Sequence, residues 1–72
     1  MTVEEQAGIA VGNLVSALVT ALHVARIDKG VSETMLAMFE RMNSAQLPEG
    51  PLRARLDQAV RTQRAVLNHL PG

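Results

Sequence analysis

Residues 7–27, AGIAVGNLVSALVTALHVARI, are the most apolar stretch of this chain and predict its longest helix. At about 100° per residue they form a helix with one broad apolar face, made by Val11, Leu14, Val15, Leu18, Val19 and Leu22. The opposite side carries small or weakly polar residues where Lys and Glu usually face water. So much apolar surface on one helix predicts that a chain of 72 residues needs a further surface to cover it.

The two sides of this helix are expected to pack against different neighbours. We expect the side around Leu14, Leu18 and Leu22 to belong to the chain's own core, and the opposite side to be an interface with a second copy or a partner helix. The candidate interface residues are Ile9, Gly12, Asn13, Ser16, Thr20, His23 and Ile27. A row of small residues at spacing four begins at Gly8 and would let another backbone approach closely. Packing against the chain's own helices explains that row equally well.

The first helix is expected over about residues 3–28. Thr2 is suited to the N-cap, and Glu5 stands at the spacing of a capping box. Lys29 and Gly30 supply the cation and the left-handed residue that commonly end a helix.

Two shorter helices are expected over about residues 33–46 and 51–69, the second helix capped by Ser32 and the third begun by Pro51. Each has one apolar face. The apolar residues of the second are Met35, Met38, Phe39, Met42 and Ala45, and those of the third are Leu52, Leu56, Ala59, Val60, Val66, Leu67 and Leu70. Gln63 lies in the middle of the third apolar stripe.

We therefore predict an all-α fold in which residues 1–72 form a single helical domain. Its three-helix unit would have the long first helix at the centre, with the other two as an amphipathic helical hairpin. Because the first helix is apolar on nearly two sides, the unit is expected to assemble as a helical homodimer.

Composition limits the classes of function. Seven basic and seven acidic residues give a net charge of zero, which argues against binding to nucleic acid or membranes through bulk charge. The chain has no cysteine, as suits a reducing cytoplasm. Residues 7–27 have nearly the length of a membrane span, but Asn13 and His23 oppose insertion. The acidic start, MTVEEQ, is also unlike a secretory signal. We expect a cytoplasmic location.

No arrangement of residues points to catalysis. His23 and His69 lie on different predicted helices without the spacing of a metal-binding pair, so neither a metal nor another cofactor is expected. Glu33 and Glu40 could in principle act as acid and base, but both are expected on the solvent side of a short helix. The sequence predicts that the chain is not an enzyme.

Two features favour nucleic acid as an alternative partner. Residues 24–43 resemble a degenerate helix-turn-helix, although Arg26 and Lys29 stand where a small and an apolar residue are usual. On the third helix, Arg53, Arg61 and Arg64 form a candidate face for an anion or a partner protein. Ion pairs with Asp57 at spacing four are the simpler explanation of that face.

The sequence as a whole predicts a small non-enzymatic module for protein–protein interaction, an adaptor or regulator that acts through the first helix. A nucleic-acid-binding regulator is the alternative hypothesis.

Overall fold

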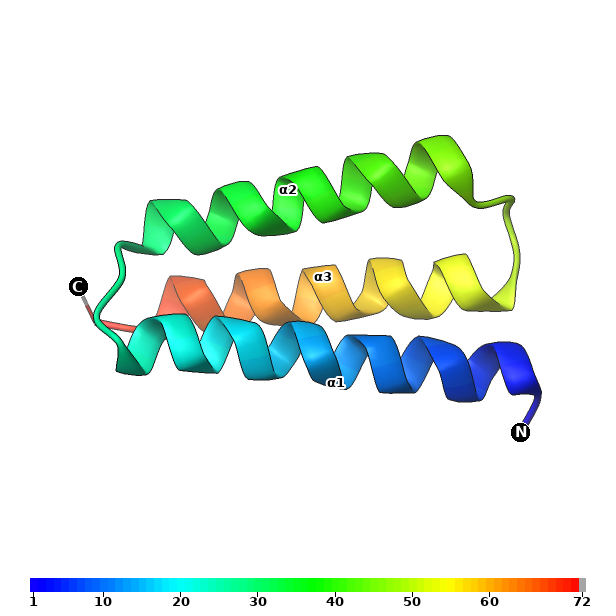
Figure 1. The fold of residues 1–72 in the computed structure, drawn as a ribbon, viewed down its shortest axis with the longest axis horizontal. Helices are drawn as coiled ribbons and strands as arrows, with labels where there is room; N and C mark the ends of the chain where they lie inside the picture. The colour runs from blue at the N-terminus through cyan, green and yellow to red at the C-terminus, as the bar shows by residue number, and fades with distance from the viewer. Residues whose placement is uncertain (72) are drawn as a thin grey trace.

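The computed structural model describes residues 1–71, which fold into three α-helices joined by two short connections (Figure 1). The helices are α1 (Val3–Val24), α2 (Lys29–Gln46) and α3 (Pro51–His69). In Figure 1, α1 and α3 run in the same direction along the long axis, and α2 runs in the opposite direction. No strand occurs among residues 1–71, so the all-α prediction is confirmed.

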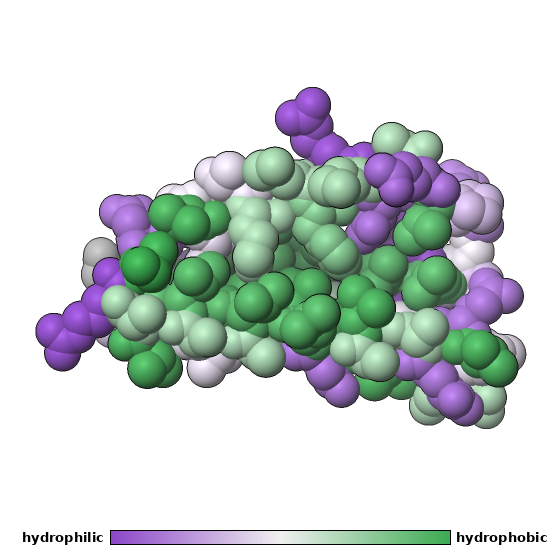
Figure 2. Space-filling view, in the orientation of Figure 1, coloured by the Kyte–Doolittle hydropathy of each residue, from purple (hydrophilic) through white to green (hydrophobic). Residues whose placement is uncertain are grey.

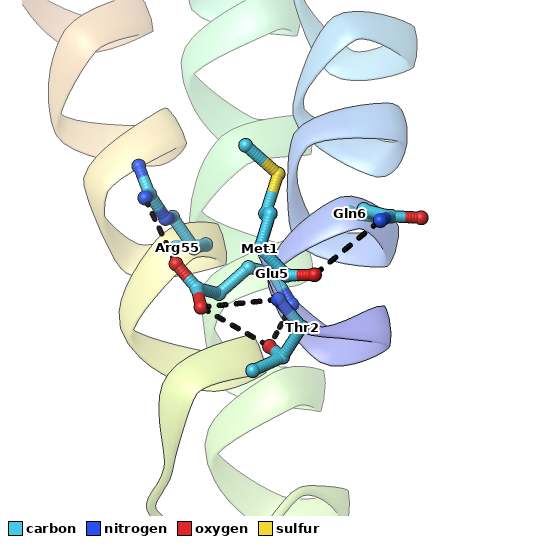
Figure 3. Close-up of polar contacts among 5 residues, drawn as sticks. All are labelled: Met1, Thr2, Glu5, Gln6 and Arg55. Carbon is cyan, nitrogen blue, oxygen red and sulfur yellow. Dashed lines mark hydrogen bonds and ion pairs between the residues drawn. The ribbon is translucent and has the colours of Figure 1, made fainter.

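The start of α1 is held by the predicted capping box (Figure 3). The Thr2 hydroxyl accepts a hydrogen bond from the Glu5 backbone N–H at 3.1 Å, and the Glu5 carboxylate accepts one from the Thr2 N–H at 3.4 Å. Two backbone donors that a helix start leaves without partners are thus satisfied.

The end of α1 differs from the prediction. The helix ends at Val24 and not near residue 28, because Arg26 takes the left-handed conformation, with φ of 60°. The Arg26 N–H donates to the carbonyl of His23, and the Ile27 N–H donates to the carbonyl of Leu22, both at 2.9 Å. These two bonds form a Schellman motif, the role that the sequence assigned to Gly30.

The start of α2 also lies earlier than predicted. Asp28, and not Ser32, is its N-cap, since the Asp28 carboxylate accepts a hydrogen bond from the Gly30 N–H at 2.7 Å. Lys29 and Gly30 therefore belong to the first turn of α2, and Ser32 is buried inside the helix. The third helix spans the predicted residues, with Pro51 in its first turn.

The predicted placement of the first helix at the centre is wrong, because α3 is the helix that packs against both others. α1 and α2 touch each other only sparingly. The buried core residues are Val15 and Val19 of α1, Leu36 of α2, and Leu56, Val60 and Leu67 of α3. α1 and α2 therefore each pack on α3 and make few contacts with each other.

Polar contacts tie α3 to each of its neighbours. The Arg55 guanidinium lies 3.3 Å from the carboxylate of Glu5 on α1 (Figure 3), and that of Arg64 lies 3.2 Å from the carboxylate of Glu40 on α2. The Lys29 ammonium donates a hydrogen bond to the backbone carbonyl of Leu70. The hydrogen bond from the Thr2 backbone, followed by the one from Arg55, lowers the pKa of Glu5 below its usual value.

Candidate functional site

One side of α1, which we name the inner face, packs against α3 and consists of Gly8, Gly12, Val15 and Val19. A Cβ atom placed on Gly8 would lie 2.6 Å from the Cβ of Arg55, and one on Gly12 would lie 3.3 Å from the Cβ of Ala59. The small residues thus let α1 and α3 approach closely within the chain. Of the two explanations that the sequence left open for this row, packing against the chain's own helices accounts for Gly8 and Gly12.

The structure brings only part of the predicted interface together. Ile9, Gly12, Asn13 and Ser16 line a groove of about 260 Å³ between α1 and α3, whose other side includes Gln58. The remaining three candidates, Thr20, His23 and Ile27, are exposed and lie outside this groove. Whether these residues bind a partner stays a prediction.

The largest difference from the sequence prediction concerns the leucines of α1. Leu14 and Leu18, which were expected in the core, have 59% and 44% of their surface exposed, whereas Val19 is 1% exposed. The close approach at the inner face turns α1 so that its small residues face α3. The bulkier leucines are consequently carried away from α3 toward solvent.

Leu14 belongs to a row of exposed apolar residues that runs the whole length of α1. We name this row the outer seam, and its members are Val3, Ala7, Ala10, Leu14, Ala17, Ala21 and Val24. Their separations alternate between four and three residues, which is the 3.5-residue period of helices that pair as coiled coils. On a plain helical wheel the seam merges with the inner face into one broad apolar surface. Its alternating spacing was the signal that could have separated them.

Apolar surface continues from α1 onto α2 (Figure 2). Val31, Met38 and Met42 are about half exposed, and with the partly buried Met35 and Phe39 they line a groove of about 740 Å³. The predicted core face of α2 is therefore only partly correct: Leu36 and Ser32 are the residues buried in this helix. We name Val31, Met38 and Met42 the α2 wall.

The predicted arginine face is largely occupied by partners within the chain. Arg64 pairs with Glu40, and the Arg53 guanidinium lies 4.0 Å from the Asp57 carboxylate and 3.5 Å from the Leu47 carbonyl. Arg61 is exposed. These contacts leave little of the predicted charge for an external anion.

The connection between α1 and α2 does not have the geometry of a helix-turn-helix. The helices of that motif cross at about 90–120°. In Figure 1, α1 and α2 instead run in opposite directions along the same long axis. Nucleic-acid binding stays a hypothesis without support from this geometry.

Two further properties bear on what the molecule could bind. Within residues 1–71, no group of three His, Cys, Asp or Glu side chains is arranged to hold a metal ion. α1 is long and apolar enough to cross a membrane by length and composition, and only 17% of its most apolar window is buried in this fold.

Comparison with other proteins finds no similarity: no family model, curated protein or solved structure matches this chain.

Proposed function

We propose that this chain is a non-enzymatic protein–protein interaction module, an adaptor or regulator, which binds an α-helix along the outer seam of α1. The observation that carries the proposal is the exposure of Leu14 in the outer seam and of Leu18 at its edge, on a face whose apolar surface continues onto α2 (Figure 2). Apolar patches of this extent on small proteins usually mark a binding surface. A helix is the fitting occupant because the seam has the period of a helix-pairing surface.

The surface supports binding better than catalysis. Its side chains are aliphatic or thioether groups, which neither donate nor accept protons. The ion-paired Glu5 and Glu40 lie at contacts with α3, where they join helices. A surface of this chemistry recognises a complementary apolar face and does not activate a substrate.

The experiment is site-specific photo-cross-linking of the full chain in the cells that make it. A benzophenone amino acid replaces Leu18 in one variant and Arg61, which is exposed on α3, in a matched control. We expect a discrete protein adduct from position 18 and none from position 61, with circular dichroism confirming that both variants are folded.

Three outcomes would overturn the proposal. They are equal labelling from both positions, no adduct from either position, and transfer of the label from position 18 to lipid. The last outcome would identify α1 as a membrane helix, in keeping with its length and composition.

A further inference from the structure

We infer that the helix bound by the outer seam is α1 of a second copy of this chain, laid antiparallel about a twofold axis near Leu14. This inference rests on the proposed function, because it names the partner of the same surface. Four observations carry it: the order of residues along the seam, the chemistry of its two edges, the charges at its ends, and the surface area.

The residue types of the outer seam follow the same order from either end of α1. In order, its residues are valine, alanine, alanine, leucine, alanine, alanine and valine. Leu14 is the middle member. The separations alternate 4, 3, 4, 3, 4, 3 from one end and 3, 4, 3, 4, 3, 4 from the other, so matching members lie at distances from Leu14 that agree to within one residue. Two antiparallel copies therefore place Ala7 near the partner subunit's Ala21, and Val3 near the partner subunit's Val24. A surface that must complement itself across a twofold axis needs this property.

The two edges of the seam favour the antiparallel direction over the parallel one. One edge carries Val11 and Leu18, and the other carries Gln6, Asn13 and Thr20. An antiparallel twofold pair sets each edge against the same edge of its partner, so apolar side chains meet apolar ones and polar side chains meet polar ones. A parallel pair would set each edge against the opposite one, with leucine beside asparagine. Desolvation of those amides without hydrogen-bond partners would oppose the parallel arrangement.

The ends of α1 carry opposite charges. Glu4 at the start and Arg26 just after the end are both exposed, and neither forms an ion pair with another of residues 1–71. Antiparallel pairing brings each acidic end toward the basic end of the partner and also sets the two helix dipoles in opposition. Parallel pairing would place like charges together.

The exposed surface is large enough for such a pair. The accessible surface is 4917 Å² for a mass of 7.8 kDa. A compact monomer of that mass is expected to expose about 4,400 Å². The excess is about 500 Å², and a standard interface buries roughly 800 Å² on each partner, so pairing would cover this excess together with some surface that an average monomer exposes. The α2 walls would border the paired helices, and α1 would become the central helix of the assembly.

Cysteine cross-linking tests both the partner and its direction, since the chain has no cysteine of its own. We prepare Ala7→Cys and Ala21→Cys as separate full-length variants, with Thr62→Cys on the exposed surface of α3 as the control. Each is oxidised alone, and the first two are also oxidised as an equimolar mixture. Covalent pairs are measured on a non-reducing gel and by mass spectrometry.

We expect a disulfide-linked species in the mixture, joining one copy of each variant, and little from any variant alone. In an antiparallel pair, position 7 of one copy would lie about 21 Å along the helix axis from position 7 of the other copy, which is too far for a disulfide. Efficient linkage of Ala7→Cys with itself would show parallel pairing and overturn the inference. A mixture that cross-links no better than Thr62→Cys would overturn it as well. In that case, a photo-adduct from position 18 to a different protein would leave the proposed function standing.

Discussion

The inner face and the outer seam of α1 are both built from small and aliphatic residues, yet they have opposite environments. The inner face is closed against α3, where Val19 is 1% exposed and Gly8 has no room for a Cβ atom. The outer seam is open over its whole length, with Leu14 59% exposed. Apolar composition alone therefore does not decide what a helix buries. The closest backbone approach decides which side is buried, and the remaining apolar side stays exposed.

The largest effect should come from placing the same charge on the inner face and at the edge of the outer seam. Val19→Glu would bury an unpaired carboxylate in the core and should cost about 4 kcal/mol or more, enough to unfold a small domain. Leu18→Glu, one residue away, can extend its carboxylate into water. We expect that variant to remain helical by circular dichroism while losing its self-association. Equal unfolding of the two variants would contradict the distinction between the faces.

A smaller effect is expected from adding a methyl group to the inner face. Gly8→Ala would overlap the Arg55 side chain and should destabilise the fold by about 1–3 kcal/mol, despite the better helix propensity of alanine. Gly12→Ala meets Ala59 at 3.3 Å, so its strain and its propensity gain should nearly cancel. Urea unfolding of the two variants measures the difference. A more stable Gly8→Ala would show that the α1–α3 contact is looser than described.

The ion pair between α2 and α3 should matter less. Glu40→Gln removes the carboxylate partner of Arg64, and the partial exposure of both side chains limits the loss of unfolding free energy to about 1 kcal/mol or less. Glu49→Gln, which removes an exposed carboxylate that forms no ion pair within residues 1–71, is the control. Thermal melts at low and high salt should separate the two variants only at low salt. A loss that persists at high salt would assign Glu40 a role in packing.

The smallest expected effect is a pH dependence from the start of α1. The folded state lowers the pKa of Glu5, so this group stabilises the fold fully above its unfolded pKa, and the contribution is lost as the pH falls through the folded pKa. Glu5→Gln should therefore weaken the decline of stability in that acidic range. Identical acid melting profiles for wild type and variant would exclude this contribution.

Much of the fold could be predicted from local sequence. The capping box at Thr2 and the Pro51 start of α3 depend on short-range chemistry, and both are confirmed. The residues that end α1 and begin α2 could not be predicted from short-range sequence patterns. Arg26 adopts a conformation that a non-glycine residue takes rarely, and Asp28 outcompetes Ser32 as the cap.

Local sequence does not show how α1 is rotated about its own axis, that is, which of its sides faces α3. A helical wheel places Leu14 and Val15 on the same apolar side. Which of these two faces α3 is determined by close packing elsewhere on α1. Gly8 fits against Arg55, and Gly12 fits against Ala59. That fit depends on residues about 47 positions apart in the chain. The central position of α3 has the same origin, because it follows from which pair of helices can approach most closely.

The most direct test of the outer seam as an interface between copies is the mass of the wild-type chain, measured by sedimentation equilibrium over a range of micromolar concentrations. Pairing through α1 predicts a species of twice 7.8 kDa that gives way to the single mass on dilution. A constant mass of 7.8 kDa at every concentration would contradict the paired arrangement.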